Sequence, residues 1–233
     1  MSADVLVFAG MQGMTGLDFP GLVSAIVFTQ GCNFRCPYCH NAHLIVPRPP
    51  APGLSEEDAL AFLEKRKGLL DGLVISGGEP TIQPGLAAFC RSAKELGYKI
   101  KLDTNGSRPQ VVRDLLENGL VDYVALDCKT LPKQYHPQLS PEEDATGKLL
   151  GTLAVLKAFA VEREFRTTCV APFVSEETIC GLAGLLGNDA PWFLQKANVT
   201  ESMRRNGLAA LPAAELERLA GVACGLGARV SIR

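Results

Sequence analysis

Short apolar, β-branched segments alternate with longer amphipathic ones along most of this chain, and that alternation limits its possible folds most strongly. Glycine or proline separates many of the segments, so each segment is predicted to be a separate strand or helix. The predicted strands cover residues 23–29, 72–76, 99–103, 123–127, 165–170 and 192–195. The predicted helices run from Ser55 to about residue 70 and over residues 84–96, 109–118, 148–160, 175–186 and 212–223.

Strands that alternate with helices form parallel sheets with right-handed crossovers. Six strand–helix units are too few for a closed eight-fold barrel. The sequence therefore predicts an α/β fold, an open partial (β/α)6 barrel of parallel strands, with a doubly wound sheet as the alternative. A proline-rich segment at residues 46–53 is predicted to be a surface excursion between the first strand and the first helix.

Length and charge narrow the class of protein. A chain of 233 residues suits one domain, expected over 1–233, with a core at about 22–200 and a C-terminal helix and last strand over 212–232. Its 23 basic and 25 acidic side chains give a net charge of −2, which argues against duplex nucleic acid or an anionic membrane as partner. Residues 1–4 lack the basic start of a signal peptide, and no apolar run is long enough for a membrane span. A cytoplasmic protein is expected.

Three of the eight cysteines, Cys32, Cys36 and Cys39, lie in one loop directly after the first predicted strand. One such group points to a metal site in a reducing compartment rather than to a disulfide scaffold. An iron–sulfur cluster with one iron left open, zinc with His40 or His43 as fourth ligand, and no metal all remain open interpretations. The other five are expected to be buried small apolar side chains: Cys90, Cys128, Cys169, Cys180 and Cys224.

Polar side chains follow the other predicted strands at the ends where parallel folds bind ligands. The pairing of carboxylates with a lysine suits a zwitterionic ligand such as an amino acid. A tight turn alone would also explain the two glycines, and solvated loop charges would explain the acidic residues. The residues concerned are Gly77, Gly78, Glu79, Asp103, Asp127, Lys129, Arg166 and Gln195.

The pattern Cys32-x3-Cys36-x-Tyr38-Cys39, with Gly77-Gly78-Glu79-Pro80 after the next strand, resembles the radical S-adenosylmethionine (radical SAM) superfamily over nearly the whole chain. Residues 29–41 resemble, more narrowly, the activating enzymes of glycyl radical enzymes. Together with residues 17–21, 101–106 and 166–168, they are most similar to the family of anaerobic ribonucleoside-triphosphate reductase activating proteins.

The resemblance implies one [4Fe–4S] cluster, whose open iron is chelated by the amino and carboxylate groups of S-adenosylmethionine. It also implies the role of each residue. Cys32, Cys36 and Cys39 would hold the cluster; Gly77, Gly78 and Glu79 the methionyl amine; Lys129 the carboxylate; Asp103 and Asp127 the ligand or a monovalent cation; Tyr38 would lie near the adenine and His40 beside the cluster. Arg166 and Gln195 would contact substrate or, equally, form hydrogen bonds inside the barrel.

The resemblance further implies that reduced flavodoxin or ferredoxin supplies an electron, and that a 5′-deoxyadenosyl radical abstracts hydrogen from a glycine of a partner glycyl radical enzyme. One alternative is the same chemistry on a small molecule, RNA or peptide, and another is a non-catalytic zinc-binding module. The chain departs from the family at residues 194–197, Leu-Gln-Lys-Ala, where relatives tend to have proline after the glutamine.

Overall fold

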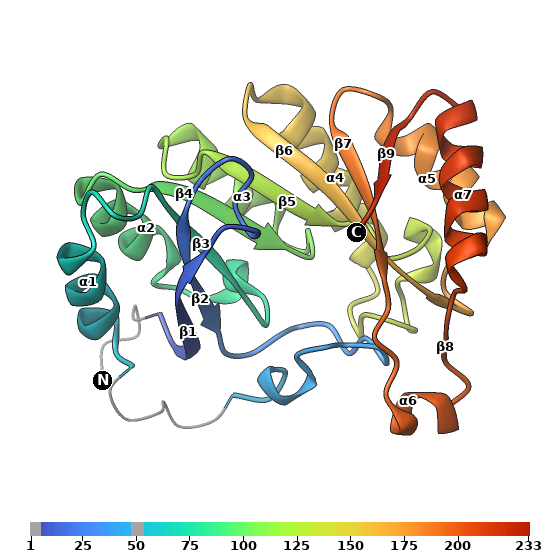
Figure 1. Ribbon diagram of the computed structural model, residues 1–233, viewed down its shortest axis with the longest axis horizontal. Helices are drawn as coiled ribbons and strands as arrows, with labels where there is room; N and C mark the ends of the chain where they lie inside the picture. The colour runs from blue at the N-terminus through green and yellow to red at the C-terminus, as the bar shows by residue number, and fades with distance from the viewer. Residues whose placement is uncertain (1–5, 48–53) are drawn as a thin grey trace.

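The computed structural model describes residues 6–47 and 54–233, shown as a ribbon in Figure 1. Two sequence predictions fall outside those residues, namely the N-terminal residues 1–4 and most of the proline-rich excursion. Within the two described ranges, no helix is both long enough and apolar enough to cross a membrane.

The strands form a sheet in the order β1-β2-β3-β4-β5-β6-β7-β9, and all neighbours from β2 onward are parallel. These parallel strands are β2 (Ser24–Thr29), β3 (Gly72–Gly77), β4 (Lys99–Thr104), β5 (Tyr123–Asp127), β6 (Glu162–Ala171), β7 (Pro191–Lys196) and β9 (Arg229–Ile232). The six predicted strands and the last strand are confirmed. The prediction began β6 three residues late, because its first three residues are charged and broke the apolar pattern.

Two strands were not predicted. β1 (Phe8–Thr15) pairs antiparallel with β2 and lies at one edge of the sheet, and the two-residue β8 (Ala209–Ala210) pairs with the end of β6. The sequence of β1 carries two glycines and little β-branched character, so its strand propensity is weak. Its place in the sheet comes from pairing with β2 rather than from its own preference.

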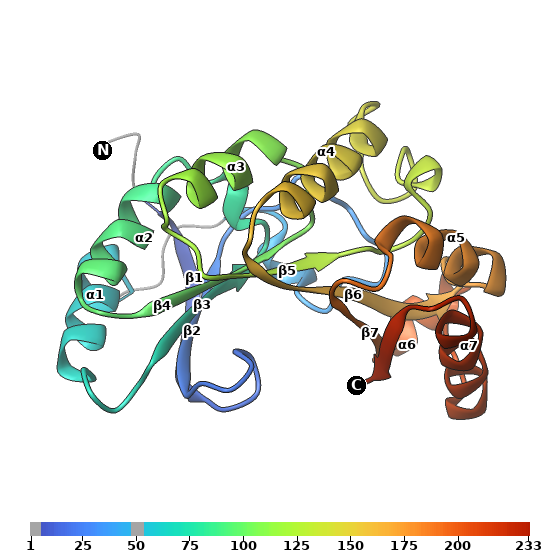
Figure 2. The same cartoon turned by 90° about the horizontal axis from the view of Figure 1, so that it is seen from above.

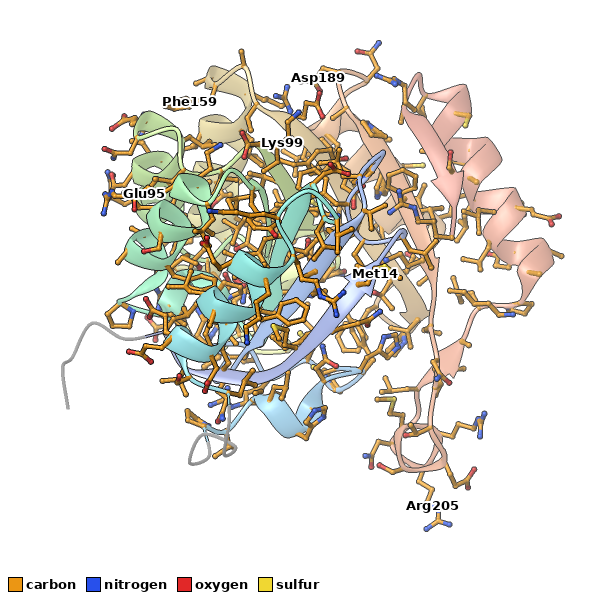
Figure 3. The ribbon with its side chains drawn as sticks, turned by 60° about the vertical axis from the view of Figure 1, so that its left-hand side comes forward. Met14, Glu95, Lys99, Phe159, Asp189 and Arg205 are labelled. Carbon is orange, nitrogen blue, oxygen red and sulfur yellow. The ribbon has the colours of Figure 1, made fainter. Side chains whose placement is uncertain are left out.

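The helices are α1 (Glu56–Lys65), α2 (Leu86–Glu95), α3 (Pro109–Glu117), α4 (Ala145–Ala158), α5 (Glu176–Leu186), α6 (Glu201–Arg205) and α7 (Ala213–Gly225). Ser55 caps α1 as expected, since its hydroxyl accepts from the Asp58 N–H at 3.1 Å. The first helix ends earlier than predicted, which leaves Leu69 two-thirds exposed. The short α6 was not predicted, and Figure 3 shows Arg205 projecting from it away from the sheet.

Figure 2 shows α1 to α5 following one another along the convex side of a strongly curved sheet. A doubly wound sheet would carry helices on both faces, so the open partial barrel is confirmed. The order of strands ends at β1 on one side and β9 on the other, and these two edges are not paired with each other. The sheet is therefore an open arc rather than a closed barrel.

Neighbouring residues of each strand face opposite sides of the sheet. Ile100 and Leu102 of β4 belong to the apolar core beneath the helices, whereas Lys101 and Asp103 alternate with them and face the concave side.

The five isolated cysteines differ in burial. Cys90, Cys128 and Cys169 are buried as expected, but Cys180 and Cys224 are exposed, so that expectation was wrong for these two.

Phe89 joins the helical layer to the unpredicted edge strand. It is fully buried in α2, and its ring meets that of Phe8 in β1 edge to face, with centroids 5.1 Å apart. Phe89→Ala should lower the free energy of unfolding by about 3–5 kcal/mol in a urea titration of the metal-free chain. Leu226→Ala, at a side chain more than half exposed, is the control and should change it by less than about 0.5 kcal/mol. Equal effects of the two variants would contradict this packing.

Candidate cofactor site

The cysteine loop begins where β2 ends and lies across the carboxyl ends of the strands. Backbone hydrogen bonds from Gly31 to Leu44 (2.7 Å) and from Cys32 to Ile45 (3.2 Å) hold its base. The three cysteines share one cavity of about 400 Å³ with every other residue predicted for the site: Tyr38, His40, Gly77, Gly78, Glu79, Asp103, Asp127, Lys129, Arg166 and Gln195. The topology thus brings together side chains from six strand ends.

β1, β2 and the loop between them also line the cavity, which was not predicted from the sequence. Their lining residues are Gln12, Asp18, Ile26 and Phe28. Asp18 belongs to the loop between these two strands, and the Asp18 carbonyl accepts a hydrogen bond from Lys101 Nζ. The segment 17–21 contributed to the family resemblance, but no residue type in it signals a place in the cavity. Only the unpredicted pairing of β1 with β2 puts it there.

The donor set fits an iron–sulfur cluster. Burial raises the pKa of the Cys32 thiol to about 12 and that of Cys36 above its usual value, so a thiolate at either position needs a strongly positive partner such as iron. No three His, Cys, Asp or Glu side chains in the described ranges are close enough to bind one metal ion. A cluster binds each cysteine through a different iron, which accommodates thiols that are further apart. Exposed His43 does not line the cavity.

Gly77 and Gly78 allow two backbone segments to approach each other. A Cβ on Gly78 would lie 1.9 Å from the Gly31 carbonyl oxygen, and one on Gly77 would lie 2.2 Å from the Thr29 nitrogen. Gly77 also has a φ of 118°, which favours glycine. The Gly78 and Glu79 N–H groups donate to Thr29 (2.9 Å) and Gly31 (2.8 Å). These glycines therefore hold the cysteine loop against β3, in addition to any contact with a ligand.

The Glu79 carboxylate connects the ends of β3 and β4. It is almost completely buried, and burial raises its pKa. Oε1 accepts from the Thr81 N–H (3.1 Å), the Thr81 hydroxyl (2.5 Å) and the Thr104 hydroxyl (2.7 Å), while Oε2 accepts from the Asn105 N–H (2.7 Å). Four donors around one carboxylate fix the two loops relative to each other.

Lys129, Asp127 and Arg166 form an ion-paired group at the wall of the cavity. Asp127 Oδ2 lies 3.0 Å from Lys129 Nζ, and Asp127 Oδ1 lies 2.9 Å from Arg166 Nε. Burial alone raises the pKa of Asp127, but the charges of Arg166 and Lys129 outweigh it and lower this pKa to about 2. Asp127 is therefore ionised at neutral pH, and it holds the Lys129 ammonium inside the cavity.

The same chain of ion pairs continues down the concave face. Arg166 Nη1 lies 3.0 Å from Asp103 Oδ2, and Lys101 Nζ lies 3.8 Å from Asp103 Oδ1 and 3.3 Å from Glu164 Oε1. Arg233 Nη1 completes it, 3.5 Å from Glu164 Oε1. Arg166 thus has the interior pairing that was the alternative to a substrate contact, while it also lines the cavity.

Tyr38 and His40 bring the far side of the cysteine loop onto neighbouring segments. The Tyr38 ring packs on Phe173 with centroids 5.2 Å apart, and its buried hydroxyl has no hydrogen-bond partner among the residues described. His40 Nε2 accepts from the Asn198 N–H at 3.2 Å. Asn198 directly follows residues 194–197, where the chain departs from the family pattern, and its backbone contacts the cysteine loop through His40.

Comparisons with known proteins agree with this geometry. The sequence model of the Radical SAM superfamily matches residues 26–186, and the chain belongs to this superfamily. Enzymes of this class use a [4Fe–4S] cluster and S-adenosylmethionine, and this chain is an enzyme of that type.

Three curated relatives narrow the comparison. A Methanocaldococcus jannaschii protein provisionally named a glycyl-radical enzyme activating enzyme (MJ1227) is 36% identical over 179 residues, 75% of this chain and 73% of that protein. The 7-carboxy-7-deazaguanine synthase of Hyperthermus butylicus is 34% identical over 150 residues, which cover 62% of this chain and 61% of the synthase. The pyruvate formate-lyase-activating enzyme of Staphylococcus aureus is 34% identical over 140 residues, which cover 56% of this chain and 55% of that enzyme.

Solved structures show the same fold at low identity. Streptococcus suis SuiB bound to its precursor peptide SuiA has a TM-score of 0.70 at 17% identity, covering 89% of this chain and 48% of that one. TYW1 with a lysine-pyruvate adduct bound has a TM-score of 0.61 at 15% identity, covering 86% of this chain and 72% of that one.

The contact between Gly78 and Gly31 can be tested directly. Gly78→Ala should push the Gly31 backbone and the adjoining Cys32 out of place, because no rotamer relieves a Cβ clash with a carbonyl. We expect a loss of about 3 kcal/mol in the free energy of unfolding of the metal-free chain. The control Gly184→Ala lies in an exposed turn of α5 with open space around the new Cβ and should not destabilise the chain. An unaltered free energy of unfolding in Gly78→Ala would refute the close approach.

Proposed function

We propose that this enzyme activates a glycyl radical enzyme by abstracting hydrogen from a glycine of that partner. The main support is the 36% identity, over three quarters of the chain, to a protein provisionally named as such an activating enzyme. The sheet that does not close on itself supports it, because an open barrel would leave room for a peptide loop of the partner to reach the cofactor site. An anaerobic ribonucleotide reductase is the proposed partner, following the family resemblance in the sequence.

In this proposal Cys32, Cys36 and Cys39 hold the cluster, and bound S-adenosylmethionine supplies a 5′-deoxyadenosyl radical when a flavodoxin or ferredoxin provides an electron. Lys129 holds the carboxylate of the ligand, since Asp127 keeps the lysine charged and turned into the cavity. The residues 77–79 line the cavity beside the cysteines and would take the amine. Tyr38 lines the same cavity and would lie near the adenine.

Asp103 and Asp127 would orient the ligand, and a monovalent cation beside them remains a prediction. Asp127 is paired with Arg166 and Lys129, whereas Asp103 Oδ1 is buried without a hydrogen bond in the described part of the chain. Lys101 Nζ lies 3.8 Å from that atom. The free cysteines and reducing chemistry favour a cytoplasmic location.

A second candidate is the same chemistry on a small polar molecule. It is favoured by the charged side chains that line the cavity, among them Asp103, Lys129 and Arg166, and by the 34% identity to a 7-carboxy-7-deazaguanine synthase. The two candidates share cluster and cofactor and differ only in the substrate that enters the cavity.

Lys129→Met tests the ligand assignment. Loss of a charge-assisted hydrogen bond of about 1.5–3 kcal/mol should weaken S-adenosylmethionine binding to the reconstituted protein by about 10–100-fold. The visible absorbance of the cluster should be unchanged, because Lys129 is not a ligand of iron. Lys133→Met, at an exposed lysine paired with Glu177, is the control and should bind normally. Unchanged affinity in Lys129→Met would reject the assignment, and loss of the cluster would show that the lysine has a structural role.

The partner is tested by electron paramagnetic resonance. Reconstituted, reduced protein with S-adenosylmethionine and an anaerobic ribonucleotide reductase should produce a persistent glycyl doublet on the reductase. Cys36→Ala should give neither the doublet nor 5′-deoxyadenosine, whereas Cys180→Ala, at an exposed isolated cysteine, should give both. Formation of 5′-deoxyadenosine without a doublet would reject this partner and favour another glycyl radical protein or the small-molecule candidate.

A further inference from the structure

The cysteine loop lies on a second segment of the chain that contributes no cysteine ligand. This segment is the connection from β5 to α4, residues 129–144, and we call it the β5–α4 segment. The Arg35 N–H donates to the Leu139 carbonyl at 2.7 Å, and the Phe34 ring meets the Tyr135 ring edge to face with centroids 5.8 Å apart. Tyr38 packs in the same apolar cluster as Leu139. Contacts to this segment thus occur on both sides of Cys36.

One end of the β5–α4 segment belongs to the cofactor site. The Tyr135 hydroxyl accepts from the Lys129 N–H at 2.8 Å and is completely buried. The Tyr135 carbonyl accepts from the Leu139 and Ser140 N–H groups at 2.8 and 2.9 Å. The backbone of Lys129 is therefore connected to the surface on which Phe34 and Arg35 lie.

The other end carries Glu142, which contacts the residue next to the first cysteine. Asn33 Nδ2 donates to Glu142 Oε1 at 3.3 Å and to the Ser107 hydroxyl at 2.9 Å. Asn33 Oδ1 in turn accepts from Asn105 Nδ2 at 3.1 Å. The Asn33 side chain is thus held from three directions, and Asn105 Nδ2 also lies 3.9 Å from the Cys32 sulfur.

Glu142 is itself fixed. Arg108 donates to both of its oxygens, at 3.0 and 2.9 Å, and Lys148 Nζ donates to Oε2. The hydrogen bonds from Arg108 lower the pKa of Glu142 to about 2, so it stays ionised at neutral pH. Its side chain is 24% exposed, and ion pairs at such positions usually contribute less than about 1 kcal/mol to stability. The three side chains that donate to this partly exposed carboxylate therefore contribute more to holding Glu142 in place than to the free energy of unfolding.

We propose that Glu142 is a positioning residue that orders the cysteine loop before the cluster binds, by holding Asn33 and through it Cys32. Ordering a loop in its bound geometry in advance lowers the cost of binding. The proposal rests on the assignment of Cys32, Cys36 and Cys39 as cluster ligands and is independent of the substrate.

The test measures how fast the cluster is lost. Glu142→Ala is reconstituted anaerobically, and bleaching of its visible absorbance by an excess of iron chelator is followed against the native chain. We expect bleaching about tenfold faster in Glu142→Ala. Glu142→Gln keeps an oxygen acceptor for Asn33 while it removes the charge, and it should return the rate to within about threefold of the native value.

A general loss of stability is separated by a matched control. Asp122 is 31% exposed, pairs with Lys94 at 2.7 Å and accepts from the Ile100 N–H at 2.7 Å, near the starts of β4 and β5 and so at the opposite end of these strands from the cysteine loop. Asp122→Asn should lower the unfolding temperature of the metal-free chain but leave bleaching at the native rate. Equal acceleration in Asp122→Asn and Glu142→Ala would overturn the proposal.

A double-mutant cycle tests the route through Asn33. Asn33→Ala should bleach at least as fast as Glu142→Ala, because it also removes the contacts with Ser107 and Asn105. The double variant should be little faster than Asn33→Ala, since Glu142 acts through Asn33. The proposal is overturned if the effects of the two substitutions on the bleaching rate multiply, or if Glu142→Ala bleaches at the native rate. The proposed function still stands in that case when the native chain holds its cluster and cleaves S-adenosylmethionine. A native chain that binds no iron on reconstitution would instead reject the ligand assignment, and the proposal with it.

Discussion

The contact on which the site depends is the approach of two backbones past the ends of β2 and β3. Parallel pairing runs through Thr29 and Gly77, and the hydrogen bonds from Gly78 and Glu79 extend it into the cysteine loop. Because a Cβ at Gly78 would overlap the Gly31 carbonyl, only glycine permits this extension. The loop consequently begins its course in a fixed direction, and the three thiols face the cavity that the other strand ends line.

From that starting point the loop is held by neighbours that come from widely separated parts of the sequence. Glu79 fixes the loop after β4, Asn105 of that loop contacts Asn33, and Glu142 holds Asn33 from the other side. Together these contacts link the loops that follow β3, β4 and β5 to the cysteine loop. A cluster site built from one short loop thereby acquires the rigidity of the sheet, which is the usual requirement for a site of defined geometry.

The parallel strands could be predicted because consecutive residues, which point to opposite faces of the sheet, are buried and give nearly continuous apolar runs. The residues at the strand ends could be predicted because topology places those ends together. The sequence did not predict β1, whose strand character depends on its partner β2. Nor did it identify Glu142, since a carboxylate in a loop has no distinguishing pattern until folding brings Asn33 to it. The two glycines were predicted for a ligand, but their tightest contacts are with backbone.

The buried charges on the concave face carry a cost that the fold does not need to bear. An apolar pair in place of Lys101 and Glu164 would usually be as stable or more stable, because desolvation offsets most of the attraction between buried ions. The chain of ion pairs instead fixes the charged side chains that line the cavity. Asp127 is shared between Lys129 and Arg166, so the Lys129 ammonium, with three N–H donors, keeps a donor for a further acceptor in the cavity.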